Sequence, residues 1–89
     1  MTYRVETTSR FDKELKKLDK YTQRMIIAWI DKNLEGCDNP RLHGKGLTAN
    51  RSGQWRYRIG DYRFICVIED EQLVILALTV GHRREVYDS

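Results

Sequence analysis

Three arginines gather in the stretch QWRYRIGDYRFICVI, which spans residues 54–68. Aromatic and β-branched residues flank Gly60-Asp61, and this pattern predicts a β-hairpin with a two-residue turn. The turn sets a register in which Arg58 faces Arg63, although directly opposed like charges are normally destabilising. Guanidinium groups grip phosphate oxygens in a bidentate manner, so an anion held between the two arginines would explain the pair.

The sequence around this hairpin is also strongly basic. Residues 41–63 contain six Lys and Arg residues against one acidic residue, Asp61, whereas residues 64–80 carry a net charge of −3. Any single arginine here is explained as a solubilising residue on an exposed sheet face. Their concentration in one block instead favours a site for an anionic partner.

The C-terminal stretch GHRREVYDS is expected to reach the same place. A strand over residues 73–80 would run antiparallel to one over 62–68, so its end near Val80 would return level with the hairpin turn. Gly81 would then permit a sharp exit from the strand. The residues that this path makes candidates for the same cleft are His82, Arg83, Arg84 and Tyr87.

The elements that must position these residues follow the order β-α-α-β-β-β. The segment TYRVET alternates like a strand, and a helix follows in which Thr8 or Ser9 is the cap and Asp12 approximates a capping box. A second helix is expected to begin near Thr22 and to stop at Gly36. Apolar stripes on both segments predict an antiparallel helical hairpin.

Three strands, over residues 54–59, 62–68 and 73–80, are expected after a long loop and complete a mostly antiparallel sheet. Alternation places the apolar residues from Trp55 to Ile68 against the helices and puts Arg56, Arg58 and Arg63 on the other face. The last segment, LVILALTV, is apolar at both parities, which is typical of a central strand covered on both faces. The predicted fold class is α+β, with the helices on one face of the sheet.

Composition excludes several classes of protein. The 89 residues suffice for one small domain, and no apolar run approaches the ~20 residues of a membrane span. The N-terminus lacks the apolar core of a signal peptide, and two cysteines without metal-ligand spacing suit a reducing cytosol. We therefore expect a cytoplasmic protein with no cofactor and no metal site. Cys66 is explained most simply as a small buried hydrophobe.

The order strand, helical hairpin, WRYRIGDYRFI, apolar strand and VGHRREVY resembles the RelE family within the RelE/ParE toxin superfamily. The resemblance spans essentially the whole chain and implies one RelE-like toxin domain over residues 1–89. It further implies a type II toxin that cleaves mRNA in the decoding site of the ribosome, inhibits translation and is neutralised by a cognate antitoxin.

The resemblance also implies site residues. Arg56 and Arg58 match two basic positions on the hairpin, Arg63 matches the arginine after its turn, and Arg83 and Tyr87 match a closing pair. The implied reaction is a metal-independent attack of the ribose 2′-OH on the adjacent phosphate. Tyr87 would be the general base and His82 the second choice, because arginines do not readily release a proton. Phosphate would be held by Arg58, Arg63 and Arg83, and RNA would be bound by Lys45, Arg51, Arg56 and Arg84.

Two other functions remain compatible with these residues. A ParE-like toxin that inhibits gyrase would use the same fold, since fold does not fix function. A non-catalytic RNA-binding module would use the basic face, although the sheet lacks paired exposed aromatic residues for base stacking.

Overall fold

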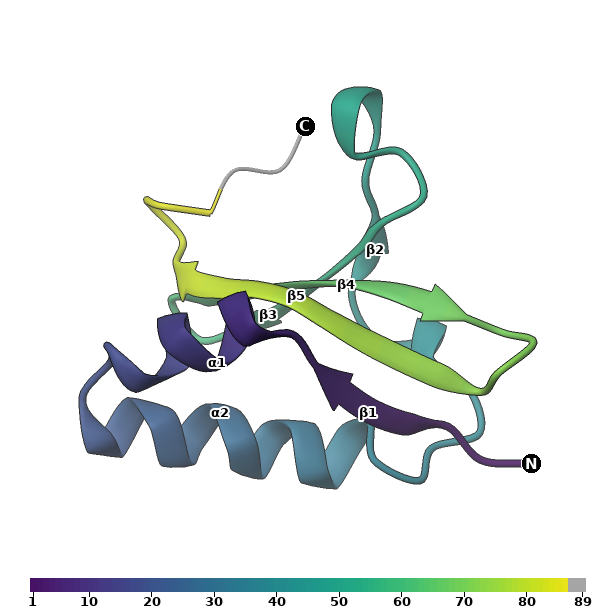
Figure 1. Ribbon diagram of the computed structural model, residues 1–89, viewed down its shortest axis with the longest axis horizontal. Coiled ribbons are helices and arrows are strands. Elements are labelled where there is room, and N and C mark those ends of the chain that lie inside the picture. The colour runs from purple at the N-terminus through teal and green to yellow at the C-terminus, as the bar shows by residue number, and fades with distance from the viewer. Residues whose placement is uncertain (87–89) are drawn as a thin grey trace.

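The computed structural model describes residues 1–86, and its α-helices lie on one face of a five-stranded sheet (Figure 1). The elements are β1 (Arg4–Thr7), α1 (Ser9–Lys16), α2 (Lys20–Asn33), η1 (Pro40–Leu42), β2 (Lys45–Gly46), η2 (Ala49–Arg51), β3 (Trp55–Ile59), β4 (Tyr62–Glu69) and β5 (Val74–His82). The strand order is β1-β5-β4-β3-β2, with β1 parallel to β5 and the other pairs antiparallel. The α+β fold is therefore confirmed.

Each helix begins at a side chain that caps it. Thr8 accepts a hydrogen bond from the backbone N–H three residues further on, and Asp19 accepts one from Thr22 N in the same way. Because Thr8 is the cap, Ser9 lies inside α1 and the expected capping box with Asp12 is wrong. α2 begins two residues before the expected Thr22, whose hydroxyl also donates to Asp19.

The core lies between the helices and the sheet, as the apolar spacing predicts. Phe11 and Ile26 from the helices are fully buried against Tyr57 and Phe64 of the hairpin. The Phe64 ring centroid lies 5.5 Å from that of Phe11 and 5.4 Å from that of Tyr57. Cys66 is also fully buried in this cluster, which confirms its interpretation as a small hydrophobe.

The hairpin register is confirmed. Arg58 pairs with Arg63, and the residues before and after them keep the expected partners. Gly60 has a φ of +59°, a left-handed conformation that a two-residue hairpin turn requires and that glycine adopts without steric cost.

Three expectations about the strands need correction. The loop before the hairpin contains β2, a two-residue edge strand in which Lys45 pairs with Arg56. β5 is an interior strand as expected, but it lies between β1 and β4, and β4 is the middle strand. β5 also continues to His82, so Gly81 is not an exit from the strand. Its missing side chain instead makes room for Val86, whose Cγ2 would lie 3.0 Å from a Cβ at Gly81.

Candidate functional site

A β-bulge decides which side chains of β5 face away from the helices. Leu78 is an extra residue in β5, because Ile65 pairs with Thr79 whereas the next residue of β4 pairs with Ala77. A bulge of this kind shifts the alternation of side chains by one position. Beyond it, Thr79 and Gly81 therefore share the helix-free face with Ile65.

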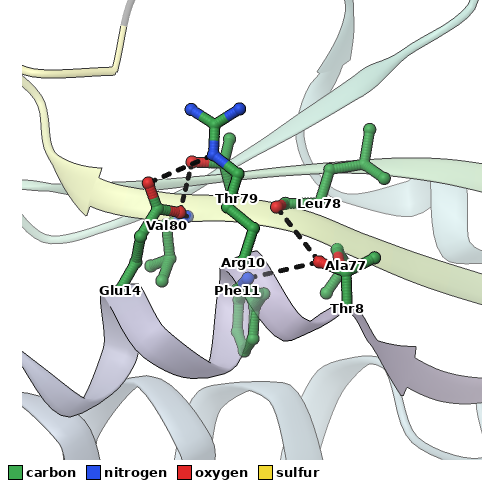
Figure 2. Close-up of polar contacts among 8 residues, drawn as sticks. All are labelled: Thr8, Arg10, Phe11, Glu14, Ala77, Leu78, Thr79 and Val80. Atoms are coloured by element: carbon green, nitrogen blue, oxygen red, sulfur yellow. Dashed lines mark hydrogen bonds and ion pairs between the residues drawn. The ribbon is translucent and has the colours of Figure 1, made fainter.

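Contacts from α1 fix the bulged end of β5 (Figure 2). Oε1 of Glu14 accepts hydrogen bonds from the Thr79 hydroxyl at 2.6 Å and from the Val80 backbone N–H at 3.2 Å. On the other side of the bulge, the Thr8 hydroxyl donates to the Ala77 carbonyl at 2.9 Å. Glu14 in the second half of α1 and the cap residue Thr8 thus hold β5 on both sides of the irregularity and fix the strand end that leads into the C-terminal segment.

The arginines of the hairpin lie on the helix-free face, as predicted, but they differ in exposure. Arg56 pairs with Lys45 of β2 on one side and with Ile65 of β4 on the other. Arg58 pairs with Arg63 two residues closer to the turn. Arg58 is exposed, whereas Arg56 and Arg63 each retain only 8% of their surface. Two of the three are therefore charges held in a largely desolvated position rather than solubilising residues.

The C-terminal segment adds a fourth arginine beside the hairpin turn. The Arg83 backbone N–H donates to the Asp61 carbonyl at 2.8 Å, and Arg83 Nε lies 4.0 Å from Asp61 Oδ1. The expected return of the chain to this turn is confirmed. We call Arg56, Arg58, Arg63 and Arg83 the cationic cluster.

The charges of the cationic cluster repel one another. Burial lowers the pKa of Arg56, and the charges of Arg63 and Arg58 lower it further. Burial likewise lowers the pKa of Arg63, with further lowering by Arg58 and Arg83 and partial compensation by Asp61. Arginine does not lose its proton in proteins at neutral pH, so the cluster concentrates positive charge. A bound anion would relieve this repulsion.

Arg58 and Arg63 are not equivalent, although the sequence makes them a matched pair. Nη1 of Arg63 donates to the Gly60 and Tyr62 carbonyls, each at 3.0 Å, so this side chain braces its own turn. Within residues 1–86, the Arg58 side chain forms no hydrogen bond or ion pair. Arg58 is therefore the member of the pair that is available to a ligand.

The structure does not bring His82 to the face that carries the arginines. His82 pairs with Tyr62, and their rings pack edge to face with centroids 5.5 Å apart, on the side of the sheet that faces the helices. His82 Nδ1 accepts a hydrogen bond at 3.2 Å from the backbone N–H of Arg84, whose side chain is exposed. Tyr87 lies outside the described residues.

Two hollows flank the cationic cluster. The larger is a cleft of about 520 Å³ at the edge of β3, which we call the edge cleft. It is lined by Trp29, Leu42, His43, Gly44, Lys45, Arg56 and Arg58. The smaller, of about 110 Å³, is lined by Arg51 together with Gly81 and Val86. Arg51 Nη1 also donates to Gln54 Oε1 at 3.3 Å.

Sequence reasoning missed the aromatic wall of the edge cleft. Helical spacing assigned Trp29 to the core, where it does pack, and no local pattern places His43 next to it. It also missed Glu14, because one acid on a charged helix face carries no signal of a contact with residues 65 positions away. Both features depend on tertiary proximity alone.

Two general properties complete the site. Residues 1–86 bring together no three His, Cys, Asp or Glu side chains that could hold a metal ion. In the same part of the chain, no helix combines the length and the apolar character needed to cross a membrane.

Comparison with known proteins gives consistent matches. A family model described as the ParE toxin of the type II toxin–antitoxin system parDE matches residues 5–87. Toxin RelG from Mycobacterium tuberculosis is 31% identical over 97% of this chain and 94% of its own length. A putative RelE-like toxin protein from Escherichia coli is also 31% identical, over 99% of this chain and 93% of its own. A chain of the toxin–antitoxin complex RelBE2 from M. tuberculosis superposes with a TM-score of 0.85 at 28% identity, covering 93% of each chain.

Proposed function

The chain belongs to the RelE/ParE toxin superfamily of type II toxin–antitoxin systems, and on that premise we propose that it cleaves mRNA in the decoding site of the ribosome. The observation that carries this proposal is the cationic cluster. Four arginines from β3, β4 and the C-terminal segment surround one hairpin turn, and two of them are largely desolvated. Such an arrangement stabilises negative charge that develops on a phosphate.

In the proposed reaction the RNA supplies its own nucleophile. The ribose 2′-oxygen forms a bond to the adjacent phosphorus while the bond from phosphorus to the 5′-oxygen breaks, which leaves a cyclic phosphate and a 5′-hydroxyl. A base takes the proton from the 2′-OH, and an acid gives one to the departing 5′-oxygen. The protein must supply these groups and neutralise the phosphate, and no step requires a metal ion.

The structure supports distinct roles for the arginines. Arg58 would make the main contact to the scissile phosphate, because it is exposed and has no partner within residues 1–86. Arg83 would contact the same phosphate from the other side of the turn or help to protonate the leaving group. Arg63 is braced against the turn, so it would contribute a fixed charge behind Arg58.

Tyr87 remains our first choice for the general base. Tyrosine has a reference pKa of about 10, so phenolate forms near neutral pH only where cations stabilise it, and the cationic cluster would provide them. His82 is the alternative, because histidine is the side chain that most often acts as a general base. Its ring, however, packs against Tyr62 on the opposite side of the sheet, which favours Tyr87.

Binding of RNA would extend beyond the scissile phosphate. Lys45 lines the edge cleft together with Arg56 and Arg58 of the cluster, and Arg51 lines the smaller hollow. Neighbouring phosphates would be contacted by Lys45, Arg51, Arg56 and Arg84. These contacts do not hold a flexible strand in the in-line geometry that 2′-OH attack requires. Correct positioning can lower a reaction barrier by several kcal/mol, and the decoding site of the ribosome would provide that positioning. The reaction would then take place in the cytoplasm, where ribosomes are.

A cognate antitoxin would be the controlling partner. The matched M. tuberculosis structure is a toxin–antitoxin complex, which supports this proposal. We expect an acidic or amphipathic segment that folds as it binds and that neutralises the cationic cluster.

Inhibition of gyrase is the second candidate, because the family model that matches residues 5–87 is described as a ParE toxin.

The nuclease activity is tested by mapping cuts in mRNA on translating ribosomes. Arg58→Ala should lower the cleavage rate by about 10²- to 10³-fold, as does loss of one donor to a developing oxyanion. Arg24→Ala is the matched control, since Arg24 is an exposed arginine on α2.

Three results would decide against the nuclease. Cleavage by Arg58→Ala at the wild-type rate would remove the role of the cationic cluster. Intact mRNA together with inhibited supercoiling by purified gyrase would establish the ParE-like activity. Binding of RNA without any cut would leave a non-catalytic RNA-binding module.

A further inference from the structure

The edge cleft continues the cationic cluster around the edge of β3. Arg58 lines the cleft and also pairs with Arg63 in the cluster, so the two sites share a wall. Lys45 also lines the cleft; it is exposed, and its side chain forms no ion pair within residues 1–86. With Arg56, the lining of the cleft therefore includes three cationic residues.

The rest of the cleft lining is aromatic or apolar. The rings of Trp29 and His43 pack edge to face, with centroids 5.7 Å apart and planes at 72°. Leu42 stands at the rim with 75% of its surface exposed, although large apolar side chains are normally withdrawn from water. A ligand that fits both sides needs a flat apolar part and an anionic part.

Several contacts hold this wall rigidly against the sheet. The Tyr57 hydroxyl donates to the Pro40 carbonyl at 2.7 Å, and Trp55 Nε1 donates to the His43 carbonyl at 2.7 Å. Gly44 packs so closely on β3 that a Cβ there would lie 2.1 Å from the Arg56 carbonyl oxygen. A ligand would therefore meet a wall that is already ordered, and ordering would not weaken its binding.

The segment that carries Leu42 is also tied to the far end of the sheet. Nη1 and Nη2 of Arg41 donate to the two carboxylate oxygens of Asp70 at 2.9 and 3.0 Å. The Tyr3 hydroxyl donates to the same carboxylate at 2.6 Å. This pairing neutralises Arg41, and the cationic residues that line the cleft are Lys45, Arg56 and Arg58.

We propose that the edge cleft binds one nucleotide of single-stranded RNA, adjacent to the phosphate held by the cationic cluster. The base would lie against Leu42 and His43, and the phosphate of that nucleotide would lie between Lys45 and Arg58. A volume of about 520 Å³ is within the range of small-molecule sites and accommodates a nucleotide. The inference rests on the proposed nuclease function, since it extends the path of the same RNA strand.

RNA fits this site better than an acidic peptide does. The carboxylates of a peptide would satisfy Lys45 and Arg58 but give no reason for aromatic rings beside them. Every base has a π face, and stacking on an aromatic side chain contributes roughly 5- to 150-fold in affinity per base. Continuity with the cationic cluster also places a neighbouring nucleotide, rather than a separate ligand, at the mouth of the cleft.

The test measures binding separately from cleavage. A short 2′-O-methyl oligoribonucleotide cannot undergo 2′-OH attack, so its affinity for the purified chain can be measured by fluorescence anisotropy at fixed salt. His43→Ala and Leu42→Ala should each weaken binding by about 5-fold or more, whereas His43→Phe keeps a ring and should restore it. Tyr21→Ala is the matched control, because Tyr21 on α2 is also 75% exposed but does not line the cleft.

The outcomes separate this inference from the proposed function. Wild-type affinity in both cleft variants, with binding still lost in Arg58→Ala, would overturn the nucleotide site and leave the nuclease intact. Variants that keep their affinity for RNA but lose affinity for a polyglutamate peptide would assign the cleft to an acidic peptide and overturn it as well. Failure of the nuclease would appear elsewhere, as absence of cleavage on translating ribosomes by a chain that still binds the oligonucleotide through Leu42 and His43.

Discussion

Replacing Glu14 by alanine should destabilise the protein more than its partly exposed position suggests. Oε1 of Glu14 is the acceptor for the Thr79 hydroxyl and for the Val80 backbone N–H. Thr79 retains only 5% of its surface and Val80 only 2%, although both line the smaller hollow, so the freed donors would be solvated poorly but not excluded from water. Each buried donor left without an acceptor costs about 1–3 kcal/mol.

The expected loss of unfolding free energy for Glu14→Ala is therefore about 2–4 kcal/mol. The ion pair of Glu14 with the exposed Arg10 adds at most about 0.5 kcal/mol, because surface i,i+4 pairs are weak. Glu14→Gln keeps an amide oxygen in place and should lose only about 1 kcal/mol. For a chain of this length, 1 kcal/mol corresponds to a shift of about 4–8 °C in Tm.

Urea unfolding of the two variants, with Asp31→Ala as the control, measures this difference. Asp31 is an exposed acid on α2, so its variant should stay within about 0.5 kcal/mol of the wild type. A loss below 1 kcal/mol for Glu14→Ala, or equal losses for the alanine and glutamine variants, would refute the reasoning. The bulge would then be stable without its acceptor.

Three further predictions follow from the contacts at other places in the fold. Arg63→Ala should lose about 1–2 kcal/mol of unfolding free energy in thermal melts, because two hydrogen bonds to the turn disappear. Arg58→Ala should melt at or slightly above the wild-type temperature, because it relieves the facing like charges. The reverse order would contradict the bracing role of Arg63. Burial raises the pKa of Cys66 to about 12, so the native state holds the thiol proton that the unfolded chain releases. The free energy of unfolding should therefore fall as pH rises from about 9 toward 12. A fall of equal size in Cys66→Ala would exclude this thiol as a contributor. Tyr87→Phe should slow single-turnover cleavage on the ribosome by at least about 10²-fold and His82→Ala should do so less, so the opposite ranking would make His82 the base.

Local patterns in the sequence were enough to predict the hairpin and the helices. The Gly60-Asp61 turn fixes the register over the neighbouring residues, and alternation then assigns the arginines and the aromatic residues to opposite faces. Helix periodicity found the core residues of α2, although the start of that helix was missed by two residues because Asp19 was not recognised as its cap. These features depend on residues that are close in sequence.

The missed features have no such local signal. β2 consists of Lys45 and Gly46, which show no alternation and pair only because β3 lies beside them. The bulge at Leu78 falls in a segment that is apolar at both parities, so no pattern could reveal a shift of one residue. Without the bulge, the continuing register would place Val80 rather than Gly81 opposite Arg63. The residues of β5 that lie beside the arginines, and the face on which His82 lies, both depend on this irregularity.

The place of β5 inside the sheet has a consequence for how the toxin is made. β1 pairs only with β5, which is the last element of the described chain to be synthesised. β1 therefore stays unpaired until the helices and the other strands have been synthesised and β5 has followed them. Pairing of strands so distant in sequence requires closure of a long loop and is a late event in folding. The helical hairpin and the β3–β4 hairpin can form early, but Arg83 joins the cationic cluster only when β5 is inserted. A nascent chain would therefore carry most of the arginines and still lack the assembled site.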